Sequence, residues 1–119
     1  MKRTASIIGL LIFLAMSSGC ILSASPDPEK TVTLAPYETK IFLVTATNVF
    51  YPGNNSMEFT WYVDGVPQEL YNPAYIFWAG PQYIGRQFNI ECVVEIKLQP
   101  SGIVLWRDSV VWAVNTSGS

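Results

Sequence analysis

The feature that most constrains the fold is a strict alternation of apolar and polar residues in RQFNIECVVEIKL, residues 86–98. The apolar positions are Phe88, Ile90, Cys92, Val94, Ile96 and Leu98. The positions between them are polar or charged, with Val93 as the one exception. Successive side chains of a strand point to opposite sides, so this period of two predicts a strand with one buried face.

The rest of the body consists of short extended segments separated by turn residues. Further strands are predicted at 31–34, 39–47, 57–63, 74–78 and 103–114, the last with a break or bulge at Arg107-Asp108. Asp64-Gly65 provides the pair of positive-φ residues that a tight hairpin turn requires. No helical period occurs outside the first 19 residues. Six or seven strands of this kind predict an all-β fold, an antiparallel Greek-key β-sandwich over residues 31–114.

The chain begins with the pattern of a secretory leader. Lys2 and Arg3 precede the apolar run IIGLLIFLAM at 7–16, and small residues at 17–19 lead to Cys20. Residues 1–19 therefore resemble a lipoprotein signal peptide, which is cleaved before a cysteine that then carries a lipid. The match departs from that pattern at the third residue before the cysteine, which is serine here and usually aliphatic in such signals.

Three fates of this leader stay open. It can be cleaved with lipidation of Cys20, cleaved without a lipid, or retained as an anchor, since residues 5–24 are 20 uncharged residues and long enough to span a bilayer. All three place the domain outside the cytoplasm, and the first and third fix it to the extracellular face of the membrane. Residues 20–30 are then expected to be a short tether, and residues 115–119 a C-terminal tail.

Charge and residue content exclude several functions. Of seven basic residues two lie in the leader, so the remainder carries five against nine acidic residues, about −4, which does not support nucleic-acid binding. The chain has no histidine, no glycine-rich phosphate loop and no metal-spaced cysteine cluster, so we predict no catalytic residues, no metal and no cofactor. Glu91 and Glu95 share a strand face but would lie about 13 Å apart, beyond the about 5–9.5 Å of glycosidase carboxylates.

The predicted core centres on one tryptophan. In immunoglobulin-type sandwiches a Trp on the third strand fills the space between the sheets, beside a Cys on a late strand. Trp61 and Cys92 have suitable positions, but the segment 39–47 has no second cysteine, so Cys92 is expected to be a buried free thiol. A disulfide between Cys20 and Cys92 would tie the leader to the core and is disfavoured. The predicted core residues are Trp61, Phe88, Ile90, Cys92, Val94 and Trp112.

Several of these segments resemble one family when read together. FTWYVDG at 59–65, YIF at 75–77, FNIECVV at 88–94 and DSVVWAV at 108–114 are similar to the PKD-type immunoglobulin-like domains of archaeal cell-surface proteins. Phe88 stands where that family often has tyrosine. The resemblance implies an extracellular, non-enzymatic module without an active site, often found beside other surface domains.

Two roles follow as hypotheses. The first is a membrane-anchored surface module with a structural, adhesion or protein-interaction role, and the alternative is a carbohydrate-binding module that uses exposed aromatic residues. Exposed rings that lie coplanar would favour the alternative, and scattered rings the first. The candidate aromatic residues are Tyr62, Tyr71, Trp78, Tyr83 and Trp106. Asn54 and Asn115 begin N-x-S/T sequences in predicted loops and are candidate glycosylation sites.

Overall fold

The computed structural model describes residues 21–47 and 54–118. The described part contains β-strands and one short 3-10 helix. These elements are β1 (Ile21–Ser25), β2 (Val32–Leu34), β3 (Thr39–Ala46), β4 (Asn55–Val63), β5 (Val66–Pro67), β6 (Ala74–Trp78), η2 (Pro81–Tyr83), β7 (Gln87–Leu98) and β8 (Ile103–Thr116). The predicted leader and Cys20 lie outside the described residues, and within them no helix is long and apolar enough to cross a membrane.

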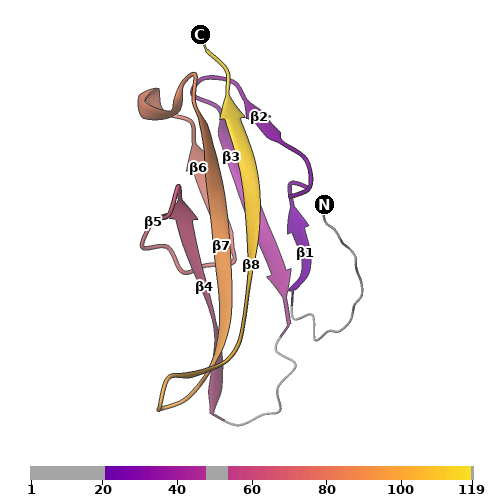
Figure 1. The fold of residues 1–119 in the computed structure, drawn as a ribbon, viewed down its shortest axis with the longest axis vertical. Helices are drawn as coiled ribbons and strands as arrows, with labels where there is room; N and C mark the ends of the chain where they lie inside the picture. Colours follow the sequence, from indigo (N-terminus) through magenta and orange to yellow (C-terminus); the bar gives the residue numbers. More distant parts are fainter. Residues whose placement is uncertain (1–20, 48–53, 119) are drawn as a thin grey trace.

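The strands form two sheets, which lie one behind the other in Figure 1. The three-stranded sheet has the order β1-β3-β6, and the five-stranded sheet has the order β2-β8-β7-β4-β5. Neighbours run antiparallel except β2 and β8, which are parallel. The prediction of an all-β protein built from two sheets is therefore confirmed.

The core fills the space between the sheets and is rich in aromatic rings. Trp61 of β4 and Trp112 of β8 stack at 5.8 Å with an interplanar angle of 12°. Phe42 of β3 contacts Trp112 from the opposite sheet, edge to face, with ring centroids 5.1 Å apart. The six residues predicted for the core are all buried: Trp61, Phe88, Ile90, Cys92, Val94 and Trp112. Contacts between rings of both sheets thus fix the sheets against each other.

The turn after β4 has the geometry that its sequence requires. Asp64 and Gly65 both have positive φ, 48° and 80°, and they connect β4 to β5. The Asp64 carboxylate also accepts a hydrogen bond of 2.8 Å from the backbone N–H of Asn89. The turn is therefore tied to the neighbouring strand β7 as well as closing its own hairpin.

The structure differs from the expected tether at residues 21–25. These residues form β1, which pairs antiparallel with β3, with a register irregularity between Ile21 and Ser23. The next residue is also held, because the Trp112 indole N–H donates a hydrogen bond of 2.6 Å to the Pro26 carbonyl. The sequence has no period of two here because β1 is an irregular edge strand held by backbone hydrogen bonds.

A second difference concerns the bulge in the last strand. Arg107 and Asp108 pair regularly with Glu95 and Val94, so the break predicted there is wrong. The irregularity lies one step earlier, where the register shifts between Ile96 and Lys97. One extra residue, Leu105, is accommodated there on β8.

Candidate interaction surfaces

The outer side of the three-stranded sheet carries no charge at its outward positions, and its large exposed side chains are all apolar. Phe42 and Phe77 point into the core, so Ile41 of β3 and Ile76 of β6 point outward, and they are direct cross-strand partners. Ile76 is 67% exposed. The outward positions of the three strands are Ser23, Ser25, Thr39, Ile41, Leu43, Thr45, Ala74, Ile76 and Trp78. We call this surface the apolar face.

Two aromatic rings pair at one end of the apolar face. Trp78 and Tyr37 have ring centroids 6.2 Å apart and planes tilted by 34°, and both rings are more than half exposed. Reciprocal backbone hydrogen bonds of 2.8 Å join the two segments, from Tyr37 N–H to Ala79 and from Ala79 N–H to Glu38. A Cβ at Gly80 would lie 2.7 Å from the Trp78 ring, so glycine is what allows this ring to lie over the backbone. Tyr37 was missed in the sequence because it sits in a turn at positive φ, outside any periodic segment.

The five aromatic residues singled out from the sequence do not form one platform. Tyr62 is half-buried at a position that faces away from the core on the five-stranded sheet. Tyr71 is exposed in the β5–β6 connection. Tyr83 packs on Phe88 at 4.8 Å and so covers an end of the core. Trp106 is partly buried against the core, and Trp78 belongs to the pair described above. These rings are scattered over different surfaces.

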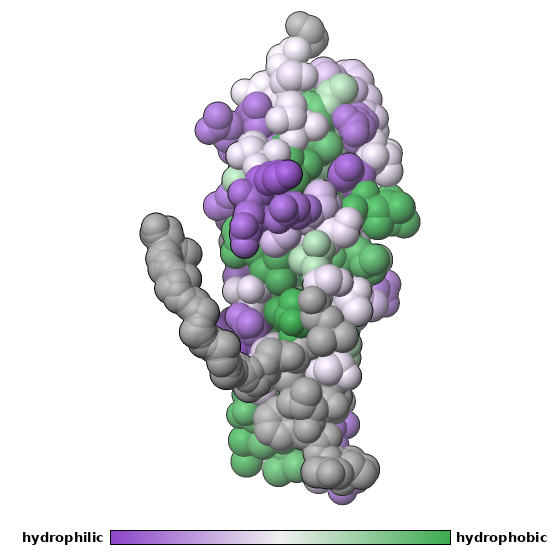
Figure 2. Space-filling view, turned by 90° about the vertical axis from the view of Figure 1, so that its right-hand side faces the viewer, coloured by the Kyte–Doolittle hydropathy of each residue, from purple (hydrophilic) through white to green (hydrophobic). Residues whose placement is uncertain are grey.

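The β7–β8 hairpin ends in an uncharged stretch, LQPSGIVLW at 98–106, which we call the hairpin end; its turn QPSG is flanked by apolar residues. Its exposed large apolar side chains are Leu98, Ile103, Val104 and Leu105. In Figure 1 the turn of this hairpin lies at the end of the sandwich opposite the C-terminus, as does the start of β4, and Figure 2 shows apolar surface at the same end.

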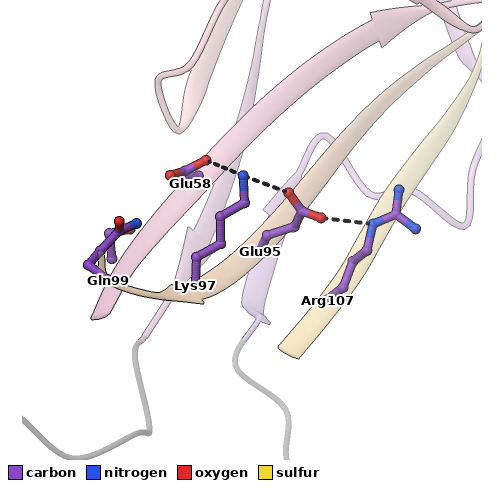
Figure 3. A network of polar contacts seen from close by, with 6 residues as sticks. Glu58, Glu95, Lys97, Gln99 and Arg107 are labelled. Carbon is purple, nitrogen blue, oxygen red and sulfur yellow. Dashed lines mark hydrogen bonds and ion pairs between the residues drawn. The ribbon is translucent and has the colours of Figure 1, made fainter. Parts of the chain in front are cut away.

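A row of ion pairs separates the hairpin end from the rest of the five-stranded sheet (Figure 3). Lys97 bridges Glu58 at 3.0 Å and Glu95 at 3.7 Å, and Glu95 also pairs with Arg107 at 3.3 Å. The hydrogen bond to Glu58 raises the pKa of Lys97 above its ordinary value. Two acids and two bases balance here, so the boundary of the hairpin end has no net charge.

The remaining residues considered for chemistry are Cys92, Glu91 and Glu95. Burial, with a smaller contribution from Glu91, raises the pKa of the Cys92 thiol to about 12, so its thiolate is not formed near neutral pH. Of the two carboxylates Glu91 and Glu95, Glu95 forms ion pairs with Lys97 and Arg107. Within residues 21–47 and 54–118, no three potential metal-binding side chains converge.

The two candidate glycosylation sites differ in their surroundings. Asn54 is exposed directly before β4. Asn115 is a half-buried residue of β8 that pairs with both Gln87 and Thr33, so the prediction that it lies in a loop is wrong. A parallel partner strand, β2, extends the pairing of β8 to this point, which the local sequence did not indicate. Asn54 is thus the position that offers more room for a glycan.

Comparison with known proteins adds no relative: no family model matches the sequence, and no curated protein and no solved structure matches it significantly.

Proposed function

We propose that this chain is a non-catalytic module held at the extracellular face of the membrane, where its apolar face binds other surface proteins. The leader at 1–19, with Cys20 after it, supports export and anchoring. The partners are the membrane, through an N-terminal lipid or retained anchor, and proteins of the same surface. Nucleic acid is not a partner, given the excess of acidic residues.

The finer fold assignment is an immunoglobulin-like sandwich of the PKD type. It is supported by the way the chain changes sheets, from β3 to β4, from β5 to β6 and from β6 to β7, which is the connectivity of Greek-key sandwiches. It is also supported by Trp61 and Cys92, which are direct partners on the neighbouring strands β4 and β7. Val44 or Ala46 of β3 would take the place of the second cysteine of such domains, and of these two Val44 is fully buried.

The observation that carries the binding role is the apolar face. Ile41, Ile76 and Trp78 are large, exposed and uncharged, and they lie side by side on two paired strands. Such contiguous apolar surface on a small domain is typical of an interaction site. Among the described strands β6 pairs with β3 alone, so its second edge is available to a strand of the partner.

A photo-cross-linking amino acid at residue 76 tests this role in the full-length protein on intact host cells. We expect discrete cross-linked adducts from this position and none from the matched position 111. Val111 is also an exposed aliphatic residue, but it lies on the five-stranded sheet. Ile76→Asp should abolish adducts formed from a cross-linker at residue 41, and Val111→Asp should leave them. Equal yields from both positions would refute the assignment, and adducts of twice the chain mass would identify a second copy as the partner.

The aromatic pair favours carbohydrate binding as a second candidate function. Tyr37 and Trp78 are both more than half exposed, with ring centroids 6.2 Å apart, and exposed rings stack on sugars. Their planes are tilted by 34° and no third exposed ring continues the platform in the described residues, so a single sugar ring is the ligand that fits. Glycan-array binding that is lost in both Tyr37→Ala and Trp78→Ala, but retained in Tyr71→Ala, would support this function over protein binding.

A further inference from the structure

We propose that the hairpin end enters the interfacial layer of the membrane, so that the domain rests on the bilayer through a second contact beside its N-terminal anchor. This inference rests on the membrane anchoring proposed above. It assigns to residues 98–106 a lipid-contacting role and gives the domain a fixed orientation on the surface.

The chain enters the fold in the part of the sandwich that carries the β7–β8 hairpin. The first described residue, Ile21, pairs with Ala46, the last residue of β3. Ala46 and Met57 line one shallow depression, so they lie in the same part of the sandwich, and Met57 pairs with Ile96 of β7. The chain therefore enters the sandwich at the end that carries the β7–β8 hairpin (Figure 1).

The hairpin projects beyond the level of the Met57–Ile96 pair. Past the Met57–Ile96 pair, the sheet continues to the partners Leu98 and Ile103, and the turn at 99–102 follows. Two strand positions span about 7 Å, and the turn brings the projection to roughly 10 Å.

No spacer separates Cys20 from the first strand of the sandwich. Because residues 21–25 are taken up in β1, a lipid on Cys20 would lie only one residue from the folded domain. One extended residue reaches about 3.4 Å, less than the projection of the hairpin. A lipid on Cys20 therefore brings the hairpin end to the bilayer.

The chemistry of the hairpin end fits that location. Amphipathic segments bury their apolar side about 5–10 Å into the boundary between headgroups and acyl chains. Leu98, Ile103, Val104 and Leu105 supply apolar side chains over that depth. Trp106, which is partly buried, follows them in the chain directly before Arg107 of the ion-pair row, and Trp is enriched at this level of the membrane. The balanced charges of the row predict little dependence on lipid charge.

The test uses the full chain with its own leader, extracted in detergent and reconstituted into vesicles of phosphatidylcholine alone or mixed equally with phosphatidylglycerol. An environment-sensitive fluorescent amino acid replaces Ser101 in the hairpin turn or, as a control, the exposed Gln82 of η2 at the opposite end of the sandwich. We expect blue-shifted emission at 101 and several-fold stronger quenching by nitroxide lipids than at 82, in both vesicle types.

A matched pair of variants checks that side-chain chemistry drives the contact. Ile103 and Val111 are aliphatic residues that are 58% and 46% exposed, and neither belongs to the buried core. Ile103→Asp should move the probe at 101 into water while the chain stays on the vesicles, whereas Val111→Asp should leave the emission of that probe unchanged.

The outcomes separate the two proposals. A chain that floats with the vesicles while its probe at 101 stays as water-exposed as the probe at 82 overturns the lipid contact and leaves the anchor intact. A chain that does not float with the vesicles overturns both.

Discussion

Truncation of Trp61 is the sharpest test of the core described above. Its side chain is fully buried, stacks on Trp112 and meets Tyr75 edge to face at 5.6 Å. Its indole N–H donates a hydrogen bond of 2.6 Å to the Asn72 carbonyl. One side chain thus joins β4 to β8, to β6 and to the β5–β6 connection.

The expected cost of Trp61→Ala follows from these contacts. Removing a buried large aromatic side chain costs about 3–5 kcal/mol. The two ring contacts and the lost hydrogen bond place Trp61 at the upper end, about 5 kcal/mol. Trp61→Phe keeps an aromatic ring in the stack but loses the N–H donor and part of the volume, so about 2 kcal/mol is expected.

Urea denaturation followed by far-ultraviolet circular dichroism measures both variants without relying on tryptophan emission. With a slope of about 2 kcal/mol per molar urea, Trp61→Ala should lower the midpoint by about 2.5 M. Trp78→Ala is the control, because that ring is 53% exposed and its loss should cost less than about 1 kcal/mol. Equal shifts in Trp61→Ala and Trp78→Ala would refute the central position of Trp61.

Three further predictions concern single side chains. The Cys92 thiol has a pKa of about 12 in the folded state, against an ordinary value of 9.0, so the thiol loses its proton at lower pH in the unfolded state than in the folded state. The free energy of unfolding should therefore fall as pH rises from 9 toward 12. The melting temperature of Cys92→Val should lack that part of the decrease, and native Cys92 should resist thiol reagents at pH 8. The Thr116 hydroxyl is buried without a hydrogen-bond partner among the described residues, so Thr116→Val should raise the free energy of unfolding by about 1 kcal/mol in urea. Gly65 has φ of 80° with open space around it, so Gly65→Ala should cost about 1 kcal/mol from backbone strain alone, and a loss of more than about 3 kcal/mol in thermal unfolding would contradict that cause.

Local patterns were sufficient wherever a strand is long and buried on one side. The alternation at 86–98 predicted which side chains of β7 point into the core, and Asp64-Gly65 predicted the hairpin turn that the structure contains. Both depend on interactions within a few residues: the period of a strand and the φ angles of a tight turn.

The candidate surfaces were only partly visible in the sequence. Trp78 was singled out correctly as exposed, but its partner Tyr37 lies 41 positions away and is brought to it by the pairing of β3 with β6. Tyr83 was an equally plausible surface ring and instead covers Phe88. Aromatic side chains fit both cores and surfaces, so composition does not distinguish these locations.

The sequence by itself determined the class of fold, the inward positions of β7 and the apolar leader, because periodicity and composition act locally along the chain. Only the tertiary structure decided that residues 21–25 join a sheet, that Ile41 and Ile76 form one apolar face, and that the chain enters beside the hairpin end. These facts depend on pairing between segments far apart in the sequence. Such pairing is fixed when the two sheets bury their common core, and no single segment encodes it.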